Sequence, residues 1–341
     1  MTDKGVAMVT GGSGYIGGWC VITLLQQGYT VRATIRDLGR AAEVKRSIES
    51  VVDPEGRLTF HQADLTSDAG WDAAAQGADF LLHVASPLGV PEPKNPDDLI
   101  IPARDGAVRA IRAAIKAGIK RVVMTSSVAA TSRPLTEPDS ESDETVWTDG
   151  DDPTAGAYAR SKTIAEKAAW EVIRSQGNGT SLTVVNPALV LGPVFASDYS
   201  DSVQIVERLL KGRIPGLPHL GFCIVDVRDV ADLHVRAMTS PEAAGERFIA
   251  AGEYAWMAEI ASMLRARLPE RVSKIPTNKA PDLLVKLAAL VDHDLKTVTP
   301  SLGHKRLFSS AKAERVLGWK PRPVEETLFD CARSLIDRGL A

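Results

Sequence analysis

Apolar residues in the first half of the chain gather in short runs, and these runs alternate with segments of helical periodicity. The runs are nearly continuous in apolar residues, which is typical of strands buried on both faces of a parallel sheet. Strands are predicted at 5–10, 30–35, 58–62, 79–85, 121–126 and 181–185. Helices are predicted at 19–27, 41–51, 71–76, 105–117 and 157–175. This alternation predicts an α/β protein built on a doubly wound parallel sheet with right-handed crossovers.

The alternation loosens after Pro187, where proline, glycine and phenylalanine cluster. A strand–helix unit at 222–238 is predicted to return to the sheet, and 247–250 is predicted to add an edge strand. From Trp256 onward the pattern is mostly helical and is interrupted by prolines. The later part of the chain is therefore expected to be organised differently from the first half.

The length and this change of pattern together predict two structural units. A chain of 341 residues exceeds the length at which a single core usually stops growing. The main domain is predicted at 1–186, with 222–250 returning to it. A smaller, mostly helical C-terminal lobe is predicted to comprise 187–221 and 251–341.

The composition is that of an ordinary globular protein, with 44% apolar and 24% charged residues. The net charge of −3 argues against nucleic acid or an anionic membrane surface as the main partner. Cys20, Cys223 and Cys331 are too few and too far apart for a disulfide framework, and the histidines lack metal-ligand spacing. With neither a long apolar run nor a signal-peptide pattern, the protein is predicted to be cytoplasmic and to hold no metal.

Three glycines follow the first predicted strand and open the first predicted helix. In the stretch TGGSGYIGG, Gly11, Gly14 and Gly17 are spaced three residues apart. Glycine lets the backbone approach a pyrophosphate closely, and the free N–H groups at the helix N-terminus then hold the anion. A strand before the turn and a helix after it favour dinucleotide binding over a plain strand-to-helix turn. The main domain is therefore predicted to be a Rossmann-type dinucleotide-binding domain.

The end of the second strand bears on the choice between NADP and NAD. A NAD site commonly places a carboxylate there for the ribose 2′-hydroxyl, whereas here Ile35 is followed by Arg36. A guanidinium can bind a 2′-phosphate with two parallel hydrogen bonds, so Arg36 favours NADP(H). Asp37 is the counter-argument, because it would take the ribose position if the strand ended one residue later. Lys45 adds positive charge nearby, although a solvated helix face explains it almost as well.

A carboxylate and a leucine follow the third strand. At that position Asp64 can accept a hydrogen bond from the adenine amino group, with Leu65 beside it. A turn or helix cap before Thr66 explains the aspartate about as well. The sequence leaves both interpretations open.

Tyr158 and Lys162 stand one helical turn apart in AYARSK, so their side chains share one helix face. Ser127 follows the fifth strand, whose carboxyl end faces the ligand crevice of an open α/β sheet. Hydride addition to a carbonyl develops charge on oxygen, which a phenol can neutralise by giving up its proton. We expect the ammonium of Lys162 and an oxidised nicotinamide to lower the phenol pKa from about 10 toward 7, and Ser127 to hold the carbonyl oxygen. Without the glycine turn and the serine, this spacing would indicate only an ordinary helix surface.

These motifs together resemble the extended short-chain dehydrogenase/reductases, and within them the dihydroflavonol 4-reductase, cinnamoyl-CoA reductase and aldehyde/ketone reductase group. The resemblance rests on TGGSGYIGG, VRATIRD, ADLT, FLLHVASP, VVMTSSVAA, YARSK, NPALVLGP and AERVLGWKPRPVEETL. It implies a catalytic set of Ser127, Tyr158 and Lys162, with Lys162 also binding the nicotinamide ribose. The asparagine of the short-chain set is not evident, since the fourth-strand segment reads HVASP, and extended members commonly lack it.

The resemblance also implies where NADP(H) is held. Arg36 and Lys45 would bind the 2′-phosphate. The other implied contacts are Ser13, Tyr15 and Ile16 at the pyrophosphate turn, Asp64 and Leu65 at the adenine, Val84, Ala85 and Ser86 along the ribose, Pro187 and Val190 against the nicotinamide, and Ser202 at the pyrophosphate.

The walls around a substrate are predicted to come from 87–93, 128–134 and 187–222. The expected contacts are Ser127, Val128, Leu189, Val194, Phe195, Leu217 and Phe222. Ordinary core packing explains any single one of them equally well. As a set they are apolar and lack an arginine–lysine cluster for a sugar-nucleotide diphosphate, which favours a small, apolar or aromatic aldehyde or ketone. The C-terminal lobe is therefore predicted to bind the substrate, and the acidic run at 137–152 to be a solvated loop at its mouth.

The sequence thus predicts an NADP(H)-dependent carbonyl reductase or alcohol dehydrogenase that acts on a small molecule as a monomer or homodimer. One alternative is a nucleotide-sugar epimerase or dehydratase on the same fold. Another is a non-catalytic dinucleotide sensor, but such a protein has no need to keep Ser127, Tyr158 and Lys162 together.

Overall fold

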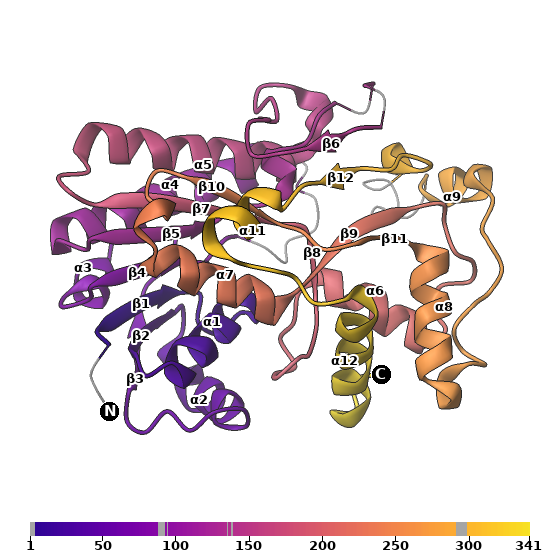
Figure 1. The fold of residues 1–341 in the computed structure, drawn as a ribbon, viewed down its shortest axis with the longest axis horizontal. Helices are drawn as coiled ribbons and strands as arrows, with labels where there is room; N and C mark the ends of the chain where they lie inside the picture. The colour runs from indigo at the N-terminus through magenta and orange to yellow at the C-terminus, as the bar shows by residue number, and fades with distance from the viewer. Residues whose placement is uncertain (1–3, 88–92, 94, 135, 138, 291–298) are drawn as a thin grey trace.

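A seven-stranded parallel sheet forms the centre of the molecule (Figure 1). The computed structural model describes residues 4–87, 93, 95–134, 136–137, 139–290 and 299–341. The strands are β1 (Val6–Thr10), β2 (Thr30–Ile35), β3 (Leu58–Gln62), β4 (Phe80–His83), β5 (Arg121–Thr125), β7 (Ser181–Pro187) and β10 (Arg247–Ala250). Their order is β10-β7-β5-β4-β1-β2-β3, and every neighbouring pair is parallel. The predicted doubly wound sheet is confirmed, including the edge strand at 247–250.

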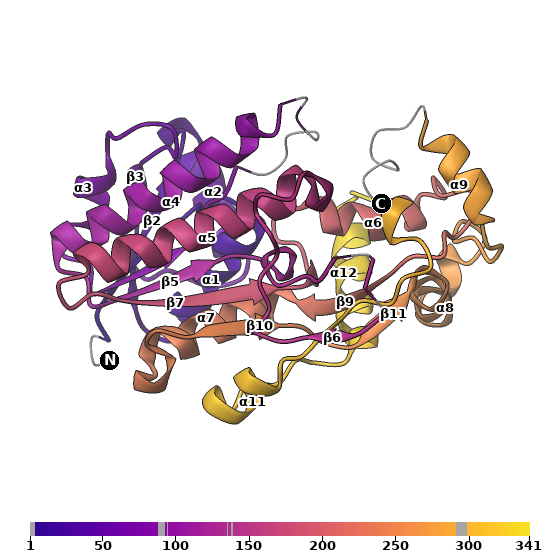
Figure 2. The same cartoon turned by 90° about the horizontal axis from the view of Figure 1, so that it is seen from above.

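Both faces of this sheet are buried, which explains why its strands are continuously apolar. Ala7 and Val9 of β1 belong to one hydrophobic core, while Met8 between them belongs to a second core on the opposite face. Helices α1 (Tyr15–Gln26), α2 (Ala41–Glu49) and α7 (Val227–Thr239) cover the first core, and α3 (Trp71–Ala75), α4 (Asp97–Ala117) and α5 (Gly156–Gln176) cover the second. Figure 2 shows α4 and α5 side by side along one face of the sheet.

Two helices begin earlier than the sequence pattern predicts. Helix α1 begins at Tyr15 rather than at 19, so the glycine turn leads directly into it. Helix α4 begins at Asp97 rather than at 105 and contains Pro102. A proline usually ends a helix, which is why the pattern placed the start of α4 after it. Asp97 and Asp98 in the first turn suit the positive end of the helix dipole.

The second half of the chain adds two small sheets and several helices beyond the carboxyl end of β7 (Figure 1). The sheets are β11-β9-β8, made of β8 (Leu189–Leu191), β9 (Gly221–Asp226) and β11 (Tyr254–Trp256), and β12-β6, made of β6 (Glu141–Ser142) and β12 (Leu307–Phe308). The helices are α6 (Asp201–Leu210), α8 (Met257–Arg267), α9 (Asp282–Ala288), α11 (Ala311–Leu317) and α12 (Val324–Asp337). Short 3-10 turns are η1 (Leu38–Arg40), η2 (Val128–Ala130), η3 (Pro153–Ala155), η4 (Pro241–Ala243), η5 (Pro269–Arg271) and η6 (Thr299–Ser301).

The predicted return of the strand at 222 to the main sheet is wrong. Strand β9 pairs in parallel with β8 and antiparallel with β11, because β10 already occupies the edge of the main sheet beside β7. The helix of the same unit, α7, does pack on the main sheet. The strand–helix unit is therefore divided between the two parts of the molecule.

One hydrophobic core continues from α1 and α7 into the C-terminal segment. Trp319 is fully buried, and its indole N–H donates to the carbonyl of Asp229 on α7 at 2.8 Å. Helix α12 contributes Leu328 and Leu335 to the same core. The predicted domain boundaries stay a prediction, but α11 and Trp319 contact the helices of the main sheet rather than the lobe alone. In the described part of the chain, no helix is long and apolar enough to cross a membrane.

Candidate active site

The glycine turn between β1 and α1 is shaped as a pyrophosphate site requires. Gly11 has a φ of 69°, which favours glycine. A Cβ on Gly17 would lie 2.1 Å from the carbonyl oxygen of Gly11, so no other residue fits there without moving the backbone. Gly14 caps α1 without a side-chain hydrogen bond, which leaves the first-turn N–H groups available for an anion.

The side chains in this turn differ in where they point. The Tyr15 ring is buried in the core, and its hydroxyl donates to the carbonyl of Gly192 at 2.7 Å. Burial raises the pKa of this phenol, which keeps it protonated. Ile16 packs against the same core, and Ser13 is half-buried at the turn. The part of Tyr15 that could meet a pyrophosphate is therefore its backbone N–H and not its ring.

The residues after β2 divide into one exposed arginine and several engaged neighbours. Arg36 is exposed, and no ion pair involves it among the described residues. The Asp37 carboxylate accepts the Gly39 N–H at 2.8 Å and so caps η1 instead of standing free for a ribose hydroxyl. Lys45 contacts Glu49 one turn along α2 at 3.4 Å, both on the exposed surface. Among these groups, Arg36 has the freest cationic side chain.

Asp64 has a local structural role after β3. Its Oδ1 accepts from the backbone N–H and the hydroxyl of Thr66, at 2.7 and 2.6 Å. These hydrogen bonds, and then the charge of Arg36, hold the pKa of Asp64 below its ordinary value. Leu65 packs against Gly106 of α4. The turn interpretation of Asp64 is thus observed, and a further contact with adenine stays a prediction.

Strand β4 and the residues after it lie against the end of β1. The Thr10 hydroxyl oxygen accepts the N–H groups of Val84 and Ala85, both at 3.0 Å, and contacts His83 Nδ1 at 2.9 Å. Burial, followed by the charge of Lys162, lowers the pKa of His83 to about 4, so this imidazole is neutral at physiological pH. Sequence reasoning missed Thr10, although it directly precedes the glycine turn.

The serine, tyrosine and lysine meet at the carboxyl end of the main sheet. Ser127 follows β5 and caps η2, where its Oγ accepts the Ala129 N–H at 3.1 Å. Tyr158 stands in the first turn of α5, close enough to Ser127 for the serine to lower the pKa of its phenol. Lys162, only 5% exposed, donates to the Ser86 hydroxyl at 3.0 Å and lies 5.8 Å from the centre of the Tyr158 ring.

The electrostatics of this set differ from the expectation. Burial around the Tyr158 hydroxyl raises its pKa, with the Ser127 hydrogen bond lowering it in part and Asp201 raising it, although 42% of the side chain is exposed. Burial also lowers the pKa of Lys162 to about 8, against the opposing charge of Glu166. The expected lowering of the phenol pKa is therefore not found in the protein alone. Burial of the phenol has the largest effect on its pKa. The ammonium of Lys162 donates to Ser86, and burial disfavours its charged form as well.

The segment after β7 brings together three predicted cofactor contacts. Pro187 ends β7 beside β10, and Val190 follows in β8. Ser202, in the first turn of α6, donates its hydroxyl to the carbonyl of Val190 at 2.6 Å. Their contacts with a nicotinamide or a pyrophosphate stay a prediction.

The predicted substrate residues fall into two groups. Val128, Leu189 and Phe222 are partly buried, and Val128 packs against a small apolar cluster of Cys223, Ile249 and Ala251. The side chains of Phe195, Val194 and Leu217 are buried in the main core, and their contact with a substrate stays a prediction. Part of the predicted 87–93 wall lies outside the described residues.

Phe195 has a packing role beside α1. It is 3% exposed and packs edge-on against Trp19, with ring centres 6.0 Å apart. A Cβ on Gly18 would lie 2.1 Å from the ring, so the phenylalanine fills the space that this glycine of α1 leaves. Sequence pattern could not distinguish this core role from a site role.

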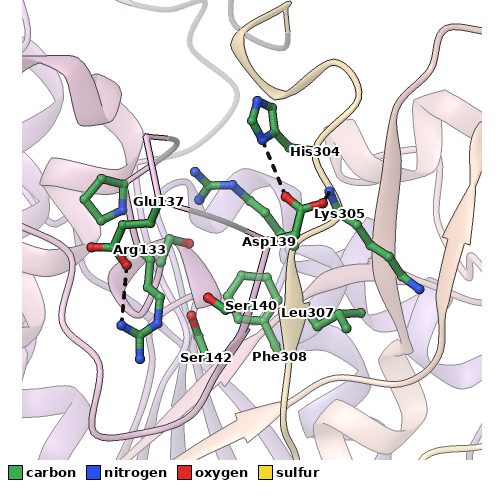
Figure 3. Close-up of a pocket in the computed structure, with 12 residues that line it drawn as sticks. Arg133, Glu137, Asp139, Ser140, Ser142, His304, Lys305, Leu307 and Phe308 are labelled. Atoms are coloured by element: carbon green, nitrogen blue, oxygen red, sulfur yellow. Dashed lines mark hydrogen bonds and ion pairs between the residues drawn. The ribbon is translucent and has the colours of Figure 1, made fainter.

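A pocket lies where the segment around β6 meets the segment around β12 (Figure 3). Asp139 faces His304, with 3.5 Å between Oδ1 and Nδ1, and Arg133 faces Glu137 at 3.5 Å. Phe308 and Ser140 also line this pocket. None of the three predicted catalytic residues lines it. This pairing joins segments far apart in sequence, and no local pattern predicted it.

Within the described chain, no cluster of three or more histidine, cysteine, aspartate or glutamate side chains could hold a metal ion. Cys20, Cys223 and Cys331 are all buried and unbridged.

Comparison with known proteins identifies relatives of this chain. The NAD dependent epimerase/dehydratase family matches residues 7–251. Cinnamoyl-CoA reductase 2 of Arabidopsis thaliana is 33% identical over 99% of this chain and 95% of that protein. Anthocyanidin reductase ((2S)-flavan-3-ol-forming) of Vitis vinifera is 33% identical over 81% of this chain and 84% of that protein. The crystal structure of yeast methylglyoxal/isovaleraldehyde reductase complexed with NADPH has a TM-score of 0.81 at 25% identity, covering 98% of this chain and all of that one.

A glycine turn on a parallel Rossmann-type sheet, followed by a serine, a tyrosine and a lysine at the strand ends, defines an oxidoreductase of the short-chain dehydrogenase/reductase type. The chain belongs to the NAD dependent epimerase/dehydratase family, which comprises the extended members of that class.

Proposed function

We propose that this protein is an NADP(H)-dependent carbonyl reductase, or alcohol dehydrogenase in the reverse direction, with Tyr158 as the proton donor. The observation that carries the proposal is that Tyr158 interacts with Ser127 next to a buried Lys162, whose ammonium lies 5.8 Å from the centre of the Tyr158 ring. These three groups supply a donor, an oxygen-binding hydroxyl and a cation at one place. Reduction of a carbonyl needs all three at the oxygen atom.

The residues around the site fit a phosphorylated dinucleotide. The uncapped start of α1 offers N–H groups to a pyrophosphate, and Gly17 leaves no side chain in the way. Arg36 is exposed and free of ion pairs among the described residues, as a ligand for a 2′-phosphate should be. One oxygen of Asp37 is already engaged as a cap, which weakens the argument for NAD. The yeast reductase of similar fold is complexed with NADPH.

The chain's own residues would then handle the oxygen and its proton. Bound NADPH supplies a hydride to the carbonyl carbon. Ser127 holds the carbonyl oxygen, and Tyr158 gives that oxygen its phenolic proton, so that a neutral alcohol forms. The raised pKa of Tyr158 keeps the phenol protonated and ready to donate at neutral pH. Lys162, with a pKa of about 8, is mostly charged at neutral pH and stabilises the phenolate until solvent reprotonates it.

A small, apolar or aromatic aldehyde or ketone is the proposed substrate. Val128, which directly follows Ser127, packs against a small apolar cluster of Cys223, Ile249 and Ala251, and this apolar surrounding supports the choice. The relatives reduce or form aromatic compounds according to their names. A panel should therefore include cinnamaldehyde, cinnamoyl-CoA, a dihydroflavonol, methylglyoxal and isovaleraldehyde, with NADPH oxidation followed by absorbance.

The first prediction tests the proton donor. Replacing Tyr158 with phenylalanine should lower kcat by about 100-fold or more, because a general acid contributes roughly that much, while the Kd for NADPH stays near the parental value. The matched control is Tyr29→Phe, which removes a hydroxyl from a tyrosine before β2, at the amino end of the sheet. A Tyr158→Phe enzyme that reduced carbonyls at the parental rate would remove Tyr158 from the acid role.

The same assays separate the proposal from two alternatives. A nucleotide-sugar epimerase or dehydratase would convert UDP- or dTDP-sugars without net consumption of NADPH. A dinucleotide sensor would bind NADPH and turn over no substrate in either assay. Net NADPH oxidation that depends on an added carbonyl is the outcome expected here.

A further inference from the structure

A buried carboxylate lies one helical turn beyond Lys162 on α5. Glu166 is fully buried, with 0% of its side chain exposed, and the proposed chemistry does not use it. Removing a carboxylate from water is costly unless it is paired and hydrogen-bonded. Its partners therefore indicate what it holds in place.

Glu166 joins α5 to two strands of the main sheet. Its Oε1 accepts from Arg247 Nε of β10 at 2.6 Å, in an ion pair whose arginine side chain is also buried. Its Oε2 accepts from Asn186 Nδ2 of β7 at 3.0 Å. The carboxylate is thus fixed at both oxygens, and so is the helix face that carries it.

Asn186 passes this connection on to the catalytic serine. The same Nδ2 group also donates to the backbone carbonyl of Ser127 at 3.1 Å. That carbonyl accepts the Ala130 N–H at 2.9 Å as well, which closes the turn η2. Two successive hydrogen bonds therefore run from Glu166 on α5 to Ser127 at the end of β5. The Oδ1 of Asn186 is buried and has no partner among the described residues. The side-chain hydrogen bonds of Asn186 are therefore the two that its nitrogen donates.

Arg247 extends the network around the other side of the site. Its Nη1 donates to the carbonyls of Glu144 and Val146 at 2.8 and 3.0 Å, and its guanidinium lies 3.7 Å from the centre of the Trp147 ring. Its Nη2 reaches the carbonyl of Ala130 at 3.4 Å. The arginine of the ion pair with Glu166 therefore also holds the segment that follows Ser127 in place.

The charge of Glu166 acts on Lys162. Tyr158 and Glu166 face the ammonium from α5, and His83 and Ser86 face it from β4 and the residues after it. His83 is neutral and Ser86 is uncharged, so they do not offset the burial of the ammonium. Glu166 raises the pKa of Lys162 against the lowering caused by burial. Asp201 of α6 acts on Tyr158 rather than on the lysine.

We propose that Glu166 is a positioning residue for the catalytic set, which holds Ser127 against α5 through Asn186 and places a fixed negative charge one helical turn from Lys162. The inference rests on the proposed carbonyl reduction for its kinetic part. Its electrostatic part concerns the protein alone and can be measured without any substrate.

The charge of Glu166 is tested by Glu166→Gln, which keeps the shape of the side chain. The pKa of Lys162 should fall by about 0.5–1 unit, because an opposing charge one turn away is lost. The alkaline limb of kcat/KM for carbonyl reduction should move to lower pH by the same amount. The lysine is followed directly by NMR of lysine-labelled protein, with its signal assigned through Lys162→Arg. Glu171→Gln, an exposed glutamate on the same helix, should leave both readouts unchanged.

Asn186→Ala keeps the ion pair of Glu166 and Arg247, so it remains informative if Glu166→Gln does not fold. It should lower kcat by about tenfold, because Ser127 is less firmly oriented, while KM for NADPH and the alkaline limb stay at parental values. A parental kcat in Asn186→Ala, or an unmoved Lys162 titration in folded Glu166→Gln, would overturn the inference. If the parental protein reduced no carbonyl, the proposed function would fail, and the NMR titration would still decide the role of Glu166.

Discussion

Two phenols show how single residues acquire different roles in this protein. Burial raises the pKa of both Tyr15 and Tyr158. The Tyr15 hydroxyl is committed to the carbonyl of Gly192, so its proton is fixed in a structural hydrogen bond. The Tyr158 hydroxyl instead meets Ser127, itself a hydroxyl that can donate or accept. The partner of the phenol, rather than its pKa, separates the structural tyrosine from the proposed catalytic one.

Arg36 allows a prediction at the same scale. Arg36→Ala should weaken NADPH binding by about 10- to 100-fold, since charge-assisted hydrogen bonds to a phosphate contribute roughly 1.5–3 kcal/mol. Binding of NADH should stay within about twofold of the parental value, because NADH carries no 2′-phosphate. Fluorescence titration of both cofactors gives the ratio. Arg46→Ala, an exposed arginine of α2, is the control, and an unchanged ratio in Arg36→Ala would exclude the phosphate role.

At the scale of elements, the site depends on helix starts. Helix α1 begins at the glycine turn and α5 begins just before Tyr158, and both starts lie at the carboxyl ends of the strands. The N–H groups at the start of α1 are uncapped, and the first three turns of α5 present Tyr158, Lys162 and the buried Glu166. The sheet thus positions two helix ends that carry different chemistry.

Gly17→Ala should disturb the first of these helix starts. The added Cβ would meet the carbonyl of Gly11, a backbone atom, so the turn must shift at a cost of about 1–3 kcal/mol. If that cost falls on the cofactor-binding geometry, NADPH affinity should drop by roughly 5- to 100-fold. Isothermal titration measures the affinity and thermal unfolding the stability. Gln26→Ala, exposed at the far end of α1, should change neither, and parental affinity in Gly17→Ala would contradict the proposed turn.

The sequence predicted those features that depend on local pattern. The strand at 30–35 is found with the predicted bounds because both of its faces are buried and every position is constrained. The pairing of β9 and the core position of Phe195 were missed, since both depend on segments distant in the sequence. Glu166 was within reach, because it follows Lys162 at the spacing that joins Tyr158 to Lys162. Its partner Arg247 was not, since the contact spans 81 positions.

At the scale of the whole molecule, the C-terminal segment is bound to the main sheet through buried charge. Asp229 of α7 accepts the Arg322 N–H at 2.8 Å and two further bonds from its guanidinium, at 2.7 and 3.0 Å. Asp226, fully buried, lies 3.8 Å from the same arginine and is paired with Arg228. This arginine therefore connects the start of α12 to the core of the protein.

Arg322→Met should lower the free energy of unfolding by about 2–3 kcal/mol, because Asp229 would lose its charged partner while remaining buried. Urea denaturation followed by circular dichroism measures the change. Lys320→Met removes an equal charge two residues earlier from an exposed pair with Glu314, and it should cost less than about 1 kcal/mol. Equal losses in the two variants would show that burial of the Arg322 pair is unimportant.

The late position of α12 has a consequence for how the protein is made. All strands of the main sheet have been synthesised once residue 250 is complete, yet Leu328 and Leu335 of the same core follow only at the end. At roughly 5–20 residues per second, the remaining stretch takes on the order of 5–20 s to translate. During that interval the nascent chain exposes the apolar surfaces of β9, α6 and α8 that α12 later covers.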